Sequence, residues 1–180
     1  MNAIPARYSR LSISLHWLML LLIAAAYATM ELRGIFPRGS DPREAMKLWH
    51  FMLGLSVLFL VIVRIAARFM APAPPIVPTP AAWQAWSAKL VHLALYALMI
   101  GLPIAGWIIL SAEGKPIPFF GLELPALVAK NHGLAETFEG IHETVGKIGY
   151  FLIGAHALAA LVHHYALRDN TLTRMLPGSR

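Results

Sequence analysis

The sequence predicts an all-α integral membrane protein, a single membrane domain over residues 1–180 folded as a four-transmembrane-helix bundle. Hydrophobic residues make up 58% of the chain and charged residues only 13%, and the mean hydropathy is +0.61. Such a composition is typical of proteins that meet lipid rather than water. Four apolar segments are long enough to cross a bilayer: residues 11–30, 47–69, 90–110 and 141–167.

The first apolar segment resembles a secretion signal, because Arg7 and Arg10 precede it and small residues follow near its end. It is longer than the apolar core of most such signals, and His16 lies inside it. We therefore expect a retained first transmembrane helix.

The connection to the second segment contains glycines and prolines that break the helical pattern, which predicts an external loop. Four basic residues lie in or beside this loop: Arg33, Arg38, Arg43 and Lys47. The second segment carries His50 near its start. Arg64 and Arg68 close to its end suit a membrane interface.

A proline-rich stretch, residues 71–86, precedes the third segment and predicts an extended surface strap that brings Trp86 to the interface. The third segment holds His92 near its start, and Pro103 predicts a kink in its second half. Residues 113–140 are too interrupted to span, so we expect a loop that caps the bundle and contains His132.

The fourth segment carries two histidines, His142 and His156, on one helical face. Fourteen residues of helix return to within roughly 40° of the same direction after about 21 Å, and the small residues Gly146 and Gly149 lie between them. Small residues there would let a flat group lie against the helix. Ionisable residues inside a span usually mark a functional site, although some histidines only bond a neighbouring helix.

Haem is the cofactor that neutral imidazoles hold axially. The chain has no cysteine, which excludes disulfides, iron-sulfur clusters and covalently attached c-type haem. Any haem must therefore be held without a covalent bond.

Pairing the histidines by depth predicts two bis-imidazole sites. With both termini in the cytoplasm, His16 and His156 meet at an inner level, while His50 and His142 meet at an outer level. The two irons would then lie about 20 Å apart along the membrane normal, which suits electron transfer across the bilayer. His92 also reaches the inner level and could replace His16 as a ligand.

The net charge of +6 is compatible with anionic lipid, because basic residues flank the apolar spans. We expect no binding of nucleic acid. No obligate protein partner is expected either.

Several stretches resemble the bacterial cytochrome b561 family over nearly the whole chain: SRLSISLHWLMLLLIAAAY, ELRGIFPR, APPIVPTP and HETVGKIGYFLIGAHALAALVHHYALRDNTLTRMLP. Within it, the chain most resembles the short di-haem type that oxidises superoxide and reduces ubiquinone in the bacterial inner membrane. The resemblance implies two b haems, held by His16, His50, His142 and His156.

A substrate hypothesis follows for each end. Superoxide would react by outer-sphere transfer at the outer haem edge, steered by Arg33, Arg38, Arg43 and Lys47. Ubiquinone would be reduced beside the inner haem in a pocket with four candidate residues: His163, His92, Lys89 and Trp86. His163 lies seven residues after His156 on nearly the same face, where an imidazole can supply a proton.

Other functions remain open from the sequence. A haem b anchor subunit of a hydrogenase or dehydrogenase complex would use the same ligands. A di-iron membrane hydroxylase would need tight histidine clusters on one membrane face, and the histidines here divide between two depths. A structural or transport role without a cofactor is the remaining alternative.

Overall fold

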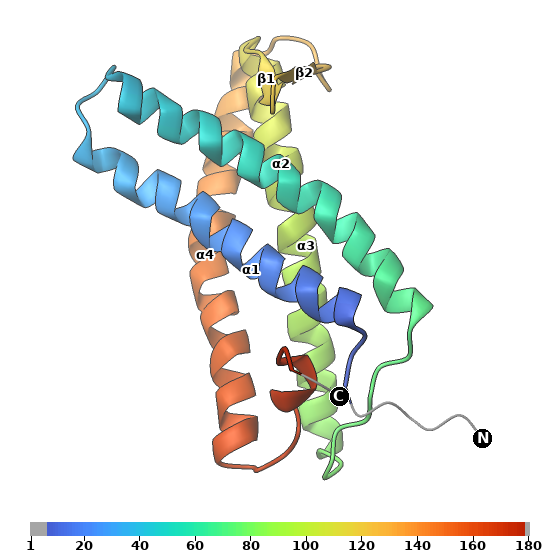
Figure 1. The fold of residues 1–180 in the computed structure, drawn as a ribbon. Coiled ribbons are helices and arrows are strands. Elements are labelled where there is room, and N and C mark those ends of the chain that lie inside the picture. Colours follow the sequence, from blue (N-terminus) through green and yellow to red (C-terminus); the bar gives the residue numbers. More distant parts are fainter. Residues whose placement is uncertain (1–6, 179–180) are drawn as a thin grey trace.

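The computed structural model describes residues 7–178, and four long helices dominate it (Figure 1). They are α1 (Arg10–Leu32), α2 (Asp41–Met70), α3 (Ala82–Glu113) and α4 (His132–Tyr165). Each is long and apolar enough to cross a membrane. The expected four-helix membrane bundle is therefore confirmed.

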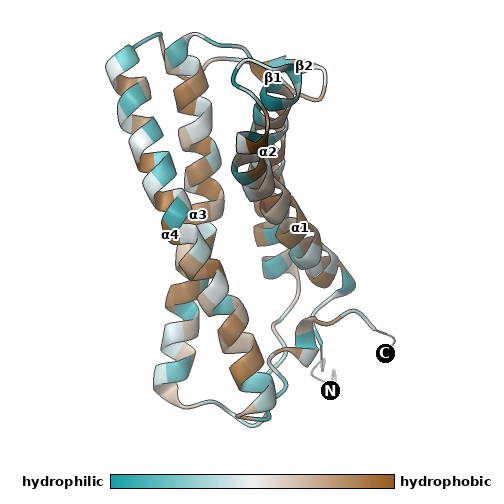
Figure 2. Cartoon of the chain, turned by 90° about the vertical axis from the view of Figure 1, so that its left-hand side faces the viewer, coloured by the Kyte–Doolittle hydropathy of each residue, from teal (hydrophilic) through white to brown (hydrophobic). Residues whose placement is uncertain are grey.

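The helices form two antiparallel pairs. α1 packs along α2, α3 packs along α4, and α2 joins the two pairs by packing on α3. Figure 1 shows the α1–α2 pair crossing the α3–α4 pair diagonally, and the side view in Figure 2 shows the pairs as two layers. One end of the bundle carries the start of α1 and the end of α4, and we call it the terminal end. The opposite end, with the β-strands, is the hairpin end.

Local signals explain where the helices begin and end. The Ser9 hydroxyl accepts a hydrogen bond from the Ser12 amide at 3.2 Å and so caps α1. Asn131 caps α4 in the same way by accepting from the Leu134 amide at 3.1 Å. α3 ends at Glu113, and the next residue, Gly114, has a left-handed φ of 71° that suits glycine. Pro103 lies inside α3 without ending it.

The expectation of a loop over residues 113–140 is partly wrong. A short antiparallel hairpin of β1 (Ile117–Phe119) and β2 (Leu122–Leu124) lies at this end, turning through Gly121. α4 then begins at His132, so His132 is helical rather than a loop residue. The Asn131 cap allows the helix to start well before the apolar run.

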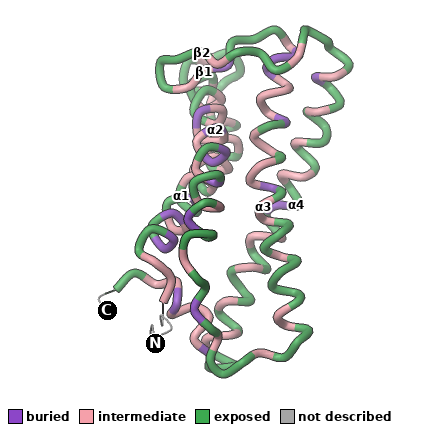
Figure 3. The backbone as a smooth tube through the Cα atoms, turned by 90° about the vertical axis from the view of Figure 1, so that its right-hand side faces the viewer, coloured by how far each residue is buried: buried purple, intermediate pink, exposed green. Residues whose placement is uncertain are grey.

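Buried side chains are few, and they follow the helix contacts. One cluster, Leu55, Leu58, Leu110 and Ile117, joins α2, α3 and β1. A second cluster, Met19, Val57 and Val61, joins α1 to α2. Most of the remaining helix surface is exposed in Figure 3, and Figure 2 shows that much of it is hydrophobic. Such a surface is suited to lipid contact.

The C-terminal segment folds back onto the terminal end through the 3-10 helix η2 (Thr173–Met175). The Trp17 indole donates to the Met175 carbonyl at 2.8 Å. The Asn170 side chain accepts from the Val77 amide at 2.8 Å, and the Asn170 amide donates to the Val77 carbonyl at 3.1 Å. The proline-rich strap is thus non-helical, as expected, and is fastened by the C-terminal segment.

Candidate functional site

Two histidine pairs lie between the helix layers. The rings of His16 on α1 and His156 on α4 have centroids 6.3 Å apart and planes at 75°. The rings of His50 on α2 and His142 on α4 have centroids 6.0 Å apart and planes at 74°. Each pair therefore connects one helix of the first layer to α4 in the second.

These separations fit an iron atom between the rings. Imidazole nitrogens bind metals at about 2 Å, so two axial rings have centroids roughly 6 Å apart across one metal ion. A macrocycle perpendicular to that axis would lie flat between the two layers. Both pairs meet this requirement.

The pair at the hairpin end also has a suitable hydrogen-bond pattern. Nδ1 of His50 lies 2.9 Å from the Ala26 carbonyl oxygen, which can only accept, so Nδ1 carries the proton and Nε2 is free to bind iron. Nδ1 of His142 is buried, and among the described residues only the Leu102 backbone carbonyl approaches it, without the geometry of a full hydrogen bond. The two rings line a small cavity of about 30 Å³ together with Gly54 and Gly106.

The pair at the terminal end has a different environment. Nη2 of Arg64 lies 3.3 Å from Nδ1 of His16, and Nη1 of Arg64 donates to the Ser12 carbonyl at 3.3 Å. The sequence had placed Arg64 at the membrane interface, so its contact with a candidate ligand was missed. Arg64 is a cation in an otherwise apolar run, and this was the one signal that could have drawn attention to it.

His92 is close enough to remain an alternative ligand. Its ring centroid lies 5.4 Å from that of His156. However, α3 and α4 belong to the same layer, whereas His16 faces His156 from the other layer. His92 is also exposed, while His16 and His156 are partly buried. The geometry favours His16.

Between the two pairs, a tyrosine occupies the place expected for a flat group. The Tyr27 hydroxyl donates to the Gly146 carbonyl at 2.8 Å. A Cβ atom added to Gly149 would collide with that hydroxyl and come within 2.9 Å of Leu98 Cδ1. The small side of α4 at Gly149 thus accommodates α1 and α3 rather than a flat group, whereas a Cβ added to Gly146 would meet nothing within 4 Å.

The candidate quinone residues make two separate sets of contacts, His163 with Asp169 and Lys89 with Trp86. Nδ1 of His163 lies 2.5 Å from Oδ2 of Asp169, and the Asp169 carboxylate is buried. Lys89 Nζ lies 4.6 Å above the Trp86 ring at the exposed start of α3. Sequence reasoning missed Asp169, although its single negative charge near a basic end was visible.

Asp169 is held in its ionised form by its neighbours. Burial alone raises the pKa of Asp169, but hydrogen bonds from His163 and Thr171 lower it more, so the net pKa lies below its usual value. The Thr171 amide donates to Oδ1 at 2.8 Å. The carboxylate can therefore orient the His163 ring with Nε2 directed away from Asp169.

Two of the four candidate steering cations have structural partners. Nη1 of Arg43 donates to the carbonyls of Arg33 and Phe36, both at 3.1 Å. Lys47 pairs with Glu44 at 2.8 Å. Arg38 is exposed.

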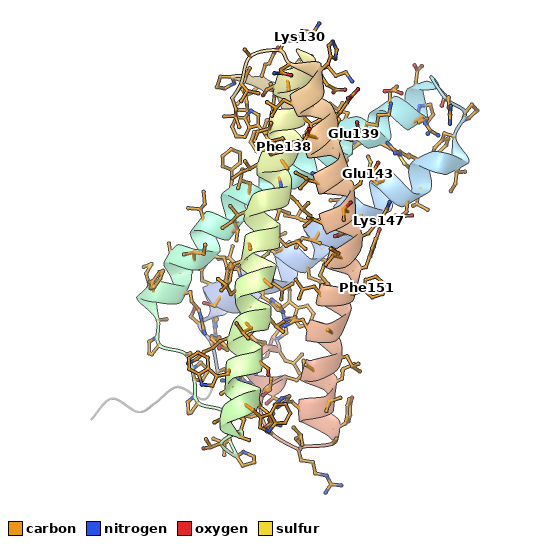
Figure 4. The ribbon with its side chains drawn as sticks, turned by 180° about the vertical axis from the view of Figure 1, so that it is seen from behind. Lys130, Phe138, Glu139, Glu143, Lys147 and Phe151 are labelled. Carbon is orange, nitrogen blue, oxygen red and sulfur yellow. The ribbon has the colours of Figure 1, made fainter. Side chains whose placement is uncertain are left out.

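Charged side chains follow the outer face of α4 at the hairpin end. Figure 4 labels Glu139, Glu143 and Lys147 on successive turns, and Lys147 lies 3.8 Å from Glu143. Charged groups avoid the bilayer core, so this part of α4 lies near the polar boundary. His142 precedes Glu143 directly, and its site is therefore close to water.

Comparisons with known proteins agree with this geometry. Residues 7–178 match the family model described as prokaryotic cytochrome b561. A Yersinia pestis protein named probable superoxide oxidase CybB is 44% identical over 174 residues, covering 97% of this chain and 98% of the relative. Cytochrome b561 homolog 1 of Escherichia coli is 43% identical, covering 95% and 97%. Cytochrome b562 of Cereibacter sphaeroides is 32% identical, covering 94% of each chain.

Three observations agree with one another. The chain has four helices of membrane-spanning length, its histidine rings are spaced to hold a metal between them, and the family model matches nearly the whole chain. The chain is a bacterial membrane protein, and it belongs to the prokaryotic cytochrome b561 family of membrane electron-transfer proteins, whose cofactor is haem b.

Proposed function

We propose that this protein holds two b haems and carries electrons across the bacterial inner membrane, oxidising superoxide at the hairpin end and reducing ubiquinone at the terminal end. Two superoxide anions lose one electron each and become dioxygen, and ubiquinone takes up two electrons and two protons. The observation that carries the proposal is the pair of cross-layer histidine contacts, 6.0 and 6.3 Å between ring centroids.

We assign His50 and His142 to the outer haem, and His16 and His156 to the inner haem. Haem supplies one-electron chemistry when bound. With two imidazoles holding each haem, these histidines would leave no place on the metal for a substrate. Electrons would then enter and leave at the haem edges.

Several features support superoxide as the donor. The relative named probable superoxide oxidase covers the chain end to end at 44% identity. The outer pair lies near the polar boundary marked by Glu143 and Lys147. Arg33, Arg38, Arg43 and Lys47 gather at the same end, where their positive field would attract an anion.

Ubiquinone reduction is proposed at the terminal end, beside the inner pair. His163 and His92 are the hydrogen-bond donors of the proposed pocket, and Lys89 and Trp86 line its entrance from lipid. Asp169 orients His163 by accepting from its Nδ1–H, so that the imidazolium form of His163 can donate its second N–H, at Nε2, to a quinone oxygen and pass on that proton. In this proposal both chain termini lie in the cytoplasm, where protons for the quinone would be taken up.

Haem quantification tests the ligand assignment. The purified protein should contain two six-coordinate low-spin haems per chain, and His156→Ala and His142→Ala should each retain one. His132→Ala is the matched control, because His132 lies on the same helix but at its exposed start, and it should retain both. One haem in the unchanged protein, or a high-spin spectrum, would contradict the assignment.

Substrate assays test the two ends separately. Superoxide should reduce the haems and then ubiquinone in the purified protein without any partner. His163→Phe should leave haem reduction by superoxide intact and slow quinone reduction. If the unchanged protein reacts only after a hydrogenase or dehydrogenase subunit is added, it is an anchor subunit instead.

A further inference from the structure

The two histidine pairs differ at the nitrogen that does not face the partner ring. A histidine that binds a metal usually donates its second N–H to a carbonyl or carboxylate, which makes the ring a stronger electron donor. His50 follows this rule at the outer pair, with the Ala26 carbonyl 2.9 Å from Nδ1.

At the inner pair, the corresponding position is taken by a cation. Nη2 of Arg64 lies 3.3 Å from Nδ1 of His16, and a guanidinium has no lone pair with which to accept a proton. Arg64 is also tied to the Ser12 carbonyl of α1 at 3.3 Å, so its charge stays beside His16. In the described part of the chain, no lysine or arginine is hydrogen-bonded to His50 or His142, and the charge of Arg33 acts on His50 only without a hydrogen bond.

This difference acts on haem reduction in opposite directions. A carbonyl beside a ligand favours the more positive, oxidised metal, whereas a positive charge beside a ligand favours the reduced metal. Charge near the cofactor and hydrogen bonds to the ligands are the means by which a protein sets a haem potential. Arg64 should therefore make the inner haem the stronger electron acceptor of the two.

We propose that Arg64 is a positioning residue that raises the reduction potential of the inner haem above that of the outer haem and so directs electrons from the hairpin end to the terminal end. The proposal rests on the two-haem function above. Each electron that moves oxidises the outer haem by one unit and reduces the inner haem by one unit, with no proton transferred.

The test is an optical redox titration of the purified holoprotein and its variants. Titration of His156→Ala identifies the inner component as the one that is lost. Arg64→Gln should then lower the equilibrium constant for reduction of the inner haem at least tenfold, which is 59 mV for a one-electron couple, and leave the outer haem unchanged.

Two further variants separate the charge from other effects. Arg68→Gln is the matched control, because Arg68 lies one turn further along α2 but stacks on the Tyr8 ring at 4.9 Å, and it should change the inner haem less than threefold. Arg64→Lys retains the charge and should restore most of the potential lost in Arg64→Gln. Haem content is measured for every variant, so a variant that fails to load is recognised.

The outcomes distinguish this proposal from the function on which it rests. If two haems are present and the component lost in His156→Ala is the one with the lower potential, the role of Arg64 is wrong and the two-haem function stands. Equal shifts in Arg64→Gln and Arg68→Gln, or no restoration in Arg64→Lys, would also overturn it. If His156→Ala removes no haem, the ligand assignment itself fails.

Discussion

Gly149 is the position where a single methyl group should do most harm to the bundle. An added Cβ would collide with the Tyr27 hydroxyl and lie 2.9 Å from Leu98 Cδ1. Overpacking of this kind costs about 1–3 kcal/mol. Displacing Tyr27 also breaks its hydrogen bond to Gly146, worth about 0.6 kcal/mol and at most about 1.7 kcal/mol in a membrane protein.

Helix propensity partly offsets this cost, because alanine is about 1 kcal/mol better than glycine inside a helix. Gly149→Ala should therefore lower the free energy of unfolding by about 1–3 kcal/mol in net terms. Gly154→Ala is the control, because Gly154 lies on the same helix and a Cβ added there meets nothing within 4 Å. It should be neutral or stabilising by up to about 1 kcal/mol.

Thermal unfolding in detergent, followed by circular dichroism, measures the difference. The midpoint should fall by about 2–4 °C for each kcal/mol in Gly149→Ala. Adding Tyr27→Phe removes the colliding oxygen and should recover most of that loss, so the two changes should not be additive. If Gly149→Ala unfolds at the same temperature as Gly154→Ala, the close packing of α1 on α4 has been wrongly inferred.

Three further predictions concern the ends of the bundle. The pKa of Asp169 is lowered in the folded protein, so its ionised form adds stability above about pH 4, and this stability is lost as the pH falls through the folded-state pKa. The free energy of unfolding of Asp169→Asn should therefore depend less on pH in acid titrations. An unchanged dependence would refute this. Arg38→Gln should slow haem reduction by superoxide and flatten its salt dependence without changing stability. Arg43→Gln should have the same effect on the rate and should also destabilise the loop by about 1–3 kcal/mol, because two carbonyls lose their donor. Equal unfolding midpoints of the two variants would argue against this role of Arg43. Asn170→Ala should expose the strap at residues 71–81 to faster proteolysis, and unchanged cleavage would show that Asn170 does not fasten it.

The sequence was sufficient to predict the membrane class and the four helices. Apolar length and helical periodicity are local properties, and a bilayer requires every backbone group in a span to be bonded within its own segment. The start of α4 was not predicted, because polar residues after His132 were read as a loop. The side chain of Asn131 caps a helix that begins there, and no apolar pattern in the sequence marks that start.

Which histidine rings lie together was also predictable, since depth follows from position along a helix. Which side chains stand beside those histidines was not. Arg64 reaches His16 across 48 residues of sequence, and Tyr27 reaches Gly146 across 119. Such neighbours depend on how the α1–α2 pair crosses the α3–α4 pair, and a crossing angle is set by the packing of all four helices together rather than by any one segment.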